Sequence, residues 1–598
     1  GYPTHGYGDH SYYAEYYGQQ SADFYNSTYD HTLMPDDFDY YDVSQDQIDA
    51  TSLFCYHCGV AVNMHYENPY YTEGSGAHTS DVPKGLRYFG YFRARRLVPL
   101  GGTEQGWHDV LRPQLDAHLP IYMSGVDGGG HAFVCDGYNS NTNRYHFNYG
   151  WGGWCDGDYT LQTMLYGASL EAIGDIIPSY LESHSSTLHM APDAASEGDG
   201  SCWEQAAGNF GDVIAAASLT SVPIWMKEGT YYGDTAESFA FTVPKGTKMY
   251  GGFAGTEDSL EQRDIDLHPT ILDGGGAQGV MSCISTNPLN THPSSTLVCG
   301  FSLTHGNQDH LSALDLAEGA TAEWMTIRDN VATFGDVVGV YSGTLQLSKI
   351  YGNESDSKII SVTDGKIKNN LIAQNRSQIA VDISEDAMVL ENTIVNNSGT
   401  AVRSATSECT ISGNILWSND STIQILTETA PKIVYCHIES DTTPDPLFVA
   451  PLDSTHRGYG AEMGDYHLQQ GSPCIDQGEK SKAFQTRMDL DGRNRFINGR
   501  SDQGCYESDY PIGIEQADSR LLFATYPNPT HDILTIRTEG LAEGSLIQLY
   551  NAMGSMIIQH ILSAEEAEAD AATLSLRGLP TGLYVLKAGG HSTKIVVR

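Results

Sequence analysis

The sequence predicts a multidomain protein with an α+β domain first, a right-handed parallel β-helix in the middle and an all-β, immunoglobulin-like sandwich at the end. Three observations support this order. Helical spacing and alternating strands mix in the first part, asparagines recur at a nearly constant interval in the middle, and alternating strands with Pro and Gly turns fill the end. We expect domains at 1–186, 201–510 and 511–598, with a linker at 187–200, where the sequence becomes polar.

Composition limits the classes of protein that the chain can represent. Its 598 residues exceed one domain of ~100–200 residues. The formal net charge is −43, which excludes nucleic-acid binding through phosphate charge and suits an extracellular or cell-surface protein. No apolar run reaches the ~18 residues of a transmembrane helix. The 11 cysteines are an odd number, so at least one thiol has no intramolecular disulfide partner.

The most informative stretch of the first domain surrounds His131. The run HAFVCDGY that begins at His131 has the apolar character of a strand, and NSNTN at 139–143 favours a turn. RYHFNYGW then alternates aromatic and polar residues, as a half-buried strand does. We therefore expect His131 and Asn148 on neighbouring antiparallel strands, where an Asn carbonyl can orient the imidazole that serves as general base in a cysteine peptidase. The alternative for a lone histidine is a hydrogen-bonded core residue.

This stretch resembles the streptopain-like cysteine peptidases, a family related in fold to papain. Members carry a Gly-rich approach, His-Ala-Phe-Val, Asp-Gly and then Asn-Trp-Gly-Trp-Gly-Gly. By this resemblance His131 matches the catalytic histidine and Asn148 the asparagine of the second element, while Tyr149 stands where the family usually has Trp. The resemblance also implies that Gly130 lets the substrate backbone approach closely and that Trp151 forms a wall of the site.

The resemblance extends over nearly all of residues 1–186, through YDHTLMP, GSGAHTSDVPKGLRYFGY and LRPQLDAHLPIYMSG. A helix is expected at 50–66, capped by Asp46 or Asp49. In the family the nucleophilic Cys lies in a Gly-Cys-Val-Ala-Thr-Ala run shortly before the Tyr-Pro that here is Tyr2-Pro3. We therefore expect an N-terminally truncated or processed domain whose nucleophile lies upstream, and a 598-residue chain without activity.

The cysteines and other histidines of the first domain favour structural roles. Cys55 and Cys58 lie past the first turn of the expected helix, so a helix N-terminus cannot lower their pKa, and buried helix cysteines are the favoured interpretation. They form a C-x-x-C, but no second pair stands at zinc-finger distance, and no H-E-x-x-H occurs. We expect no metal and no cofactor.

The middle of the chain carries an asparagine repeat. Short apolar segments end on asparagines spaced 22 or 23 residues apart, at Asn307, Asn330, Asn353, Asn375, Asn397 and Asn419. A constant interval indicates stacked coils in which each Asn hydrogen-bonds its equivalent in the next coil. IWMKEGTYY and GDYHLQQGSPCIDQG, near its two ends, resemble the pectate-lyase-like β-helices of bacterial surface proteins.

The β-helix sequence favours a binding or spacer role over catalysis. Its acidic residues are dispersed, whereas a lyase or glycosidase needs clustered carboxylates. DLDG at Asp489–Gly492 begins like a calcium loop, but Arg500 stands where an EF-hand requires Glu, so that interpretation fails.

The last domain resembles the C-terminal sorting domain of the type IX secretion system. The features that it shares are YPNP at 526–529, LPTGLY at 579–584 and KIVV at 594–597. The resemblance implies a Bacteroidetes-type bacterium, the type IX machinery as partner, and a protein that is secreted or anchored to the outer-membrane surface.

Together these features predict a secreted or cell-surface cysteine endopeptidase that acts on protein or peptide substrates. The main alternative is a surface adhesin or glycan-binding β-helix protein with a vestigial peptidase domain, whose partners would be host proteins or glycans. A third possibility is that the β-helix is itself a glycan enzyme.

Overall fold

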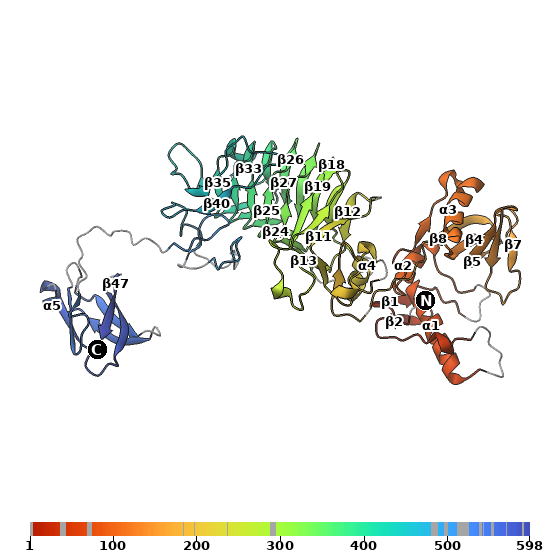
Figure 1. The fold of residues 1–598 in the computed structure, drawn as a ribbon, viewed down its shortest axis with the longest axis horizontal. Helices are drawn as coiled ribbons and strands as arrows, with labels where there is room; N and C mark the ends of the chain where they lie inside the picture. The colour runs from red at the N-terminus through yellow and green to blue at the C-terminus, as the bar shows by residue number, and fades with distance from the viewer. Residues whose placement is uncertain are drawn as a thin grey trace. The chain divides into compact units, whose positions relative to one another are not determined.

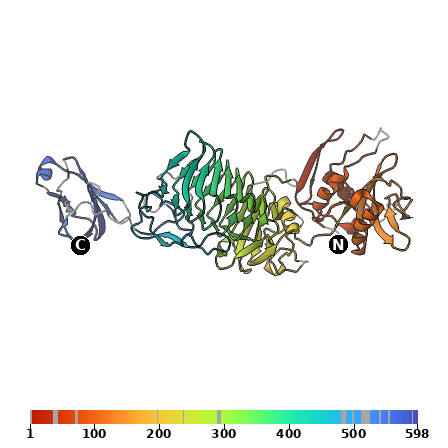
Figure 2. The same ribbon diagram turned by 90° about the horizontal axis from the view of Figure 1, so that it is seen from above.

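A computed structural model describes residues 4–35, 43–68, 74–182, 184–195, 198–235, 237–287, 295–479, 488–495, 500–510, 525–537, 541, 543–551, 555–569, 571–588 and 591–598. The pair Tyr2-Pro3 lies outside these residues. The chain divides into two compact units, Gly1–Asp509 and Tyr510–Arg598, which we describe separately. Figures 1 and 2 show the elements of each unit in two views.

In its described residues, the N-terminal region combines three α-helices with two antiparallel sheets, as expected for an α+β domain. Its helices are α1 (Gln45–Ala61), α2 (Val82–Arg87) and α3 (Glu104–Asp116). Helix α1 begins five residues before the expected 50–66 range, because Ser44 and Gln47 form a reciprocal capping box. The expected caps, Asp46 and Asp49, therefore lie inside the helix.

A six-stranded antiparallel sheet forms the second half of this region. Its order is β3 (Arg95–Leu97), β8 (Ala168–Gly174), β4 (Ile121–Val126), β5 (Gly130–Asn139), β6 (Arg144–Asn148) and β7 (Gly157–Tyr159). A separate hairpin joins β1 (Asp9–Ala14) to β2 (Gly18–Asp23). Helix α3 packs on β4 and β5, and its apolar face completes a core around Leu111, Met123 and Phe147.

The middle of the chain is a parallel β-helix built from three long sheets, as the asparagine repeat predicted (Figure 1). The ten-stranded sheet contains, in order, β37 (Lys432–Val434), β34 (Thr410–Ser412), β31 (Met388–Leu390), β28 (Lys366–Lys368), β24 (Thr344–Gln346), β20 (Ala320–Glu323), β16 (Thr296–Cys299), β13 (Lys248–Phe253), β10 (Ile224–Lys227) and β9 (Leu188–Met190). The nine-stranded sheet contains β11 (Gly229–Tyr232), β14 (Thr270–Asp273), β17 (Phe301–Thr304), β21 (Thr326–Ile327), β25 (Lys349–Tyr351), β29 (Leu371–Ala373), β32 (Thr393–Val395), β35 (Ile415–Trp417) and β38 (His437–Ile438). The eight-stranded sheet contains β12 (Phe239–Val243), β15 (Gly279–Cys283), β19 (Leu311–Leu316), β23 (Asp336–Tyr341), β27 (Lys358–Thr363), β30 (Ile379–Ser384), β33 (Thr400–Ser404) and β36 (Ser421–Ile425).

Smaller sheets complete the β-helix. One contains β18 (Asn307–Gln308), β22 (Val331–Ala332) and β26 (Glu354–Ser355), and another pairs β39 (Phe448–Ala450) with β40 (Asp465–Leu468). Strand β9 pairs in parallel with β10, so the segment expected as a linker at 187–200 contributes a strand to the first coil. Helix α4 (Phe210–Thr220) packs against both strands, and Arg93 of the N-terminal region pairs with its Asp212.

The expected asparagine ladder runs through the β-helix from Asn330 to Asn419. Each member is hydrogen-bonded to the next, as where Oδ1 of Asn375 accepts from the backbone N–H and from Nδ2 of Asn353, both at 3.0 Å. The ladder satisfies buried backbone groups at each turn, which is why the residue type repeats. The sequence did not reveal a second column, in which the backbone N–H groups of Ser348, Asn370 and Asn392 each donate to the Asn of the next coil.

Asn307 was wrongly placed in this ladder. It is exposed, and its Nδ2 donates to the Gly276 carbonyl at 3.1 Å. Oδ1 of Asn330 instead accepts from the N–H of Gly306, 24 residues earlier. The coil at this end is longer than the repeat, so extrapolating the interval of 23 residues selects the neighbouring residue.

The second unit is an all-β sandwich, as expected. One sheet contains β41 (Thr525–Tyr526), β42 (Ile533–Arg537) and β45 (Ala571–Ser575), and the other contains β44 (Met556–Ile561), β43 (Leu546–Asn551), β46 (Gly582–Ala588) and β47 (His591–Val597). They enclose a core that includes Leu534, Ile547 and Leu586, and a short helix, α5 (Ala564–Glu568), joins β44 to β45. Within the described residues of the whole chain, no helix is long and apolar enough to cross a membrane.

Candidate active site

The β5–β6 hairpin carries the two residues that the sequence singled out. The strands are antiparallel, and residues 140–143 join them, so the predicted hairpin is confirmed. Alternation buries one face, where Phe133, Tyr145 and Phe147 pack together. Tyr149, which follows β6, is also buried, and its phenolic oxygen accepts a hydrogen bond from the N–H of Leu165 at 3.0 Å. The aromatic cluster fixes the backbone on which His131 sits.

The His131 imidazole is held by a backbone carbonyl and by two rings. Its Nε2 lies 2.9 Å from the carbonyl oxygen of Tyr149, so Nε2 carries the proton and the lone pair of the neutral ring lies on Nδ1. The rings of Trp151 and Tyr166 lie with their centroids 4.7 and 4.9 Å from the imidazole. These three contacts restrict the rotation of the ring.

Asn148 does not reach His131 in this structure. Its Oδ1 accepts the N–H of Gly150 at 2.8 Å, and the side chain is exposed. The reason lies in the period of the strand, because the inward face takes Phe147 and Tyr149 and thereby turns Asn148 outward. Asn148 pairs with Val134 rather than with His131. The neighbouring Tyr149 carbonyl occupies the orienting position that the sequence assigned to the Asn148 amide.

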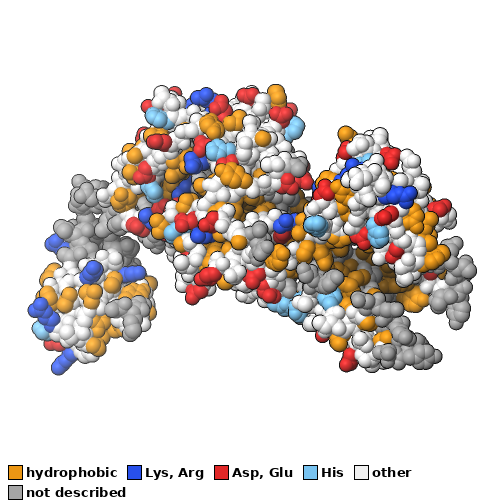
Figure 3. Space-filling model, turned by 45° about the vertical axis from the view of Figure 1, so that its right-hand side comes forward, with side chains coloured by type: hydrophobic (Ala, Val, Ile, Leu, Met, Phe, Trp, Pro, Cys, Tyr) orange, Lys and Arg blue, Asp and Glu red, His pale blue; other side chains and the backbone are white. Residues whose placement is uncertain are grey.

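A large cleft opens beside His131. It has a volume of about 1630 Å³, and Gly130, His131, Cys55 and Cys58 are among its lining residues. Figure 3 shows hydrophobic side chains gathered in a recess of the N-terminal region. The cleft exceeds the ~300–1,000 Å³ of a small-molecule pocket and has room for an extended peptide. Trp151 does not line the cleft but packs on the imidazole that does.

Comparisons with known proteins agree with this geometry. Residues 1–159 match the Peptidase C10 family, residues 318–462 the right-handed β-helix region and residues 524–598 the secretion system C-terminal sorting domain. The chain thus carries a Peptidase C10 domain. With the parallel sheets and the C-terminal sandwich, this confirms the predicted fold class and the three resemblances.

Several cysteine peptidases are similar to parts of the chain. The thiol protease/hemagglutinin PrtT of Porphyromonas gingivalis is 30% identical over 251 residues, 40% of this chain and 28% of that protein. Streptopain of Streptococcus pyogenes serotype M1 is 36% identical over 109 residues, 18% of this chain and 26% of that protein. A structure of active interpain A from Prevotella intermedia is 34% identical, covers 29% of this chain and 76% of that one, and has a TM-score of 0.27. The chain therefore spans about a quarter of the length of the two curated relatives.

The sorting domain fixes the destination of the protein. A secretion system C-terminal sorting domain at 524–598 indicates that the protein is secreted or held at the outer-membrane surface. The large negative charge of the chain agrees with an extracellular location.

The cysteines of the Peptidase C10 domain differ in environment. Burial raises the pKa of the Cys58 thiol to about 12, and burial likewise raises that of Cys135 to about 12. At neutral pH both are therefore thiols rather than nucleophilic thiolates. Cys55 is exposed on α1, ten residues past the helix start. Within the described residues, no group of three or more His, Cys, Asp and Glu side chains is arranged to hold a metal ion.

Sequence reasoning missed Tyr166, the second ring beside His131. It follows the histidine motif by some 15 residues and has a left-handed φ of 57°. Gly125 makes room for it, because a Cβ at that position would collide with the Tyr166 carbonyl. Gly125, the last residue but one of β4, was the available signal, since a glycine within a strand often marks a close backbone approach.

Proposed function

We propose that the Peptidase C10 domain contributes the base half of a secreted cysteine endopeptidase, with His131 as the proton-transfer residue. The supporting observation is the His131 imidazole, which lines the large cleft with Nε2–H held by the Tyr149 carbonyl. A neutral imidazole fixed in this tautomer presents Nδ1 as the nitrogen that can accept a proton. Protein or peptide substrates follow from the family and from the width of the cleft. The type IX secretion machinery is the partner of the sorting domain.

In this mechanism His131 moves one proton in each half of the reaction. Nδ1 accepts the thiol proton as the sulfur attacks the peptide carbonyl, and the imidazolium then donates that proton to the departing amine. Nδ1 next takes a proton from the water that hydrolyses the thioester, which restores the thiol. The Tyr149 carbonyl stabilises the imidazolium through the Nε2–H bond. Trp151 and Tyr166 shield that bond from water, which strengthens it. Gly130 leaves the rim of the cleft open to the substrate backbone.

We further propose that the 598-residue chain alone does not cleave peptides, because Cys55, Cys58 and Cys135 of the Peptidase C10 domain are poorly suited to serve as the nucleophile. Two of the cysteines in the Peptidase C10 domain, Cys58 and Cys135, are held protonated by burial. Cys55 lies far along α1, where the helix N-terminus gives no help to a thiolate.

Casein hydrolysis tests both proposals. The purified chain should show no thiol-dependent hydrolysis, whereas a longer gene product with a Gly-Cys-Val-Ala-type segment should show it and lose it on His131→Ala. Hydrolysis by the 598-residue chain that disappears on His131→Ala would overturn the proposed inactivity. Hydrolysis by the longer product that survives His131→Ala would overturn the role of His131. His118→Ala, at an exposed histidine of the same domain, is the matched control.

A second candidate function is glycan or protein binding by the β-helix at the cell surface, with the peptidase domain as a vestige. One observation favours it, namely a hollow on the β-helix with two exposed tyrosines at its rim. Retained surface binding by a variant without peptidase activity would support it.

A further inference from the structure

The β-helix carries a hollow of about 480 Å³ where the strands β11, β14, β17 and β21 end. The volume lies within the ~300–1,000 Å³ typical of ligand pockets. Its lining comes from five separate segments of the chain, which are represented by Tyr232, Asp273, His305, Asp329 and Tyr459. The sequence positions give no hint of this grouping, because the coils bring together residues that are up to 227 positions apart.

The polar lining is organised around His305. Its Nδ1 donates to Oδ2 of Asp273 at 2.8 Å, which leaves Nε2 as the acceptor of the neutral ring. Oδ1 of Asp273 accepts the N–H of Gly275 at 2.8 Å. A side chain at Gly275 or Gly276 would meet no atom within 4 Å, so the backbone there is open to the hollow. These groups can donate and accept hydrogen bonds within a short distance of one another.

The carboxylates of the hollow are already engaged. Oδ1 of Asp329 accepts the N–H of Gly460 at 3.0 Å, and Oδ2 pairs with Arg328 at 2.7 Å. Asp273 is engaged by Gly275 and His305. Each carboxylate keeps its negative charge, but both of its oxygens already accept a hydrogen bond within the protein, so neither carboxylate is free to bind a cationic ligand directly. Among the described residues that line the hollow, no group of three or more His, Cys, Asp and Glu side chains is arranged to hold a metal ion. A neutral, hydroxyl-rich ligand fits this lining best.

Two tyrosine rings stand at the rim. Tyr232 is 72% exposed and Tyr459 is 53% exposed. An aromatic face presents negative charge density to the weakly positive C–H groups of an apolar surface. The face of a hexose ring carries C–H groups, whereas its edge carries hydroxyls. A sugar can therefore cover a tyrosine with its face and hydrogen-bond to His305 with its edge.

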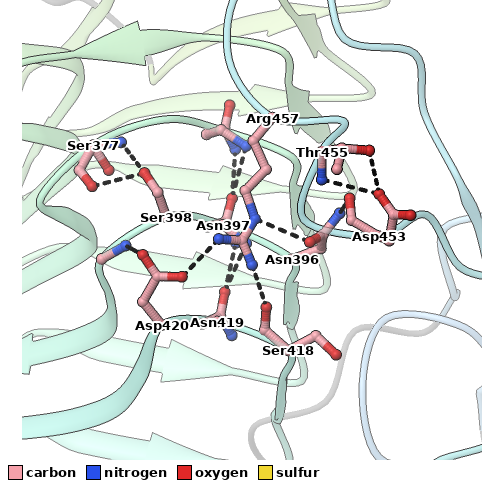
Figure 4. Close-up of polar contacts among 12 residues, drawn as sticks. Ser377, Asn396, Asn397, Ser398, Ser418, Asn419, Asp420, Asp453, Thr455 and Arg457 are labelled. Carbon is pink, nitrogen blue, oxygen red and sulfur yellow. Dashed lines mark hydrogen bonds and ion pairs between the residues drawn. The ribbon is translucent and has the colours of Figure 1, made fainter.

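Tyr459 is held in place before any ligand arrives. It lies in a return segment, residues 453–461, that runs back along the turns of the coils. Arg457 clamps this segment, with Nε donating to Asn396 at 3.0 Å, Nη1 to Asp420 at 2.6 Å and Nη2 to the Ser418 carbonyl at 2.7 Å (Figure 4). The N–H of Gly458 donates to the Gln374 carbonyl at 2.8 Å. These contacts fix the backbone that carries Tyr459, and ordering a segment before binding lowers the entropy cost of binding.

We propose that this hollow binds a neutral, hexose-containing saccharide, with Tyr232 and Tyr459 as stacking surfaces and His305 as the hydroxyl-recognition residue. The proposal deepens the second candidate function and rests on it. It assigns that function to one site on the β-helix and excludes acidic glycans as preferred ligands, because both carboxylates would repel them.

Titration calorimetry of the full 598-residue chain tests the site. The probes are neutral tetrasaccharides of glucose, mannose and galactose, with a tetragalacturonate and spermidine as charged comparisons. At least one neutral probe should bind, and Tyr459→Ala and Tyr232→Ala should each weaken it about tenfold or more. His305→Ala should weaken it as well. Phe334→Ala is the matched control, since Phe334 is 74% exposed on the same β-helix but lies outside the hollow, and it should leave binding unchanged.

Other outcomes contradict the proposal. Binding of no neutral probe overturns it, as does preferential binding of tetragalacturonate or spermidine, or equal loss in Phe334→Ala. Circular dichroism of each variant verifies the fold. Arg457→Ala provides a second route, because it frees the return segment without touching the hollow and should weaken binding as Tyr459→Ala does. Saccharide binding should also be unchanged in His131→Ala. The saccharide site and the proposed peptidase function can therefore be tested independently, and either can fail without the other.

Discussion

The two candidate sites of this protein are assembled in opposite ways. His131 and its partners Tyr149, Trp151 and Tyr166 lie within 36 consecutive residues, and one hairpin with its following loop sets their geometry. The hollow of the β-helix draws its side chains from five segments, among them Tyr232 and Tyr459. A local site leaves a motif in the sequence, whereas a site built across stacked coils leaves none.

The same contrast governs stability. Beside the antiparallel sheet, buried polar side chains can form single pairs, such as His108 of α3 with Tyr145 of β6. In the β-helix, an interior Asn of the ladder such as Asn375 is hydrogen-bonded to the coil on either side of it. Loss of one ladder residue therefore disturbs two interfaces between coils. The predictions below test this difference, from the largest expected effect to the smallest.

Asn375→Ala should have the largest effect. Its Oδ1 accepts two hydrogen bonds from Asn353, and its Nδ2 donates to Ile350 and Asn397, all in the buried interior. The substitution leaves these buried groups without hydrogen-bond partners and should lower the free energy of unfolding by roughly 3–5 kcal/mol. Urea unfolding followed by tryptophan fluorescence measures it. Asn419→Ala, at the less buried end of the ladder, should cost clearly less, and equal costs would contradict the two-sided role.

Glu507 should make the stability of the β-helix depend on pH. Burial, reinforced by the nearby Asp502 carboxylate, raises the pKa of Glu507 to about 8. The folded protein then keeps a proton that the unfolded chain releases near pH ~4.3, so stability falls as pH rises from about 4.3 to about 8. The loss should reach roughly 2–4 kcal/mol, and Glu507→Gln should remove it. Unfolding midpoints at pH 5 and pH 8.5 measure this loss of stability. The control Glu428→Gln, at an exposed residue, should not change the loss.

Tyr145→Phe should have an intermediate effect in the antiparallel sheet. The Tyr145 hydroxyl lies 2.6 Å from Nδ1 of His108, and both side chains are buried. Removing the hydroxyl leaves one buried ring nitrogen of His108 without its hydrogen-bond partner. The free energy of unfolding should fall by about 1–2 kcal/mol, measured by the thermal unfolding of the chain. Tyr138→Phe removes an exposed bond to Asp116 and should change stability much less. A cost for Tyr145→Phe as large as that of Asn375→Ala would break the contrast between the two regions.

Asn148→Ala should have the smallest effect. The side chain is exposed and accepts one turn hydrogen bond, so stability should change by no more than about 0.5 kcal/mol. The ring of His131 should stay protonated on Nε2, since the Tyr149 carbonyl holds it. Nitrogen-15 NMR of the histidine side chains reads the tautomer directly. A shift toward the Nδ1–H form in this variant would restore the orienting role that the sequence assigned to Asn148.

Sequence reasoning reached the fold and part of the site. Periodicity revealed the hairpin of His131 and the asparagine ladder, because both follow from rules that act over a few residues or at a fixed interval. The side chain of Asn148 lies outward because Tyr149 takes the inward position, where it contacts Leu165 of a later loop. The orienting role of Asn148 stays a prediction.

Sequence reasoning overlooked Tyr166 and the second Asn column, although Gly125 and the 22-residue spacing of Asn370, Asn392 and Asn414 were available signals. It could not find the hollow, because the hollow depends on contacts between distant segments.

The return segment at 453–461 changes how the β-helix should come apart. A solenoid held only by contacts between adjacent coils can lose its end coils one at a time. Here Arg457 is tied to Ser418 and Asp420, while Gly460, three residues later, is tied to Asp329. The segment thus links several coils through its hydrogen bonds. Pulling on the chain from its C-terminal side must break these hydrogen bonds before the coils that they connect can unwind. Forced unfolding should accordingly proceed in one large step rather than as a series of small ones.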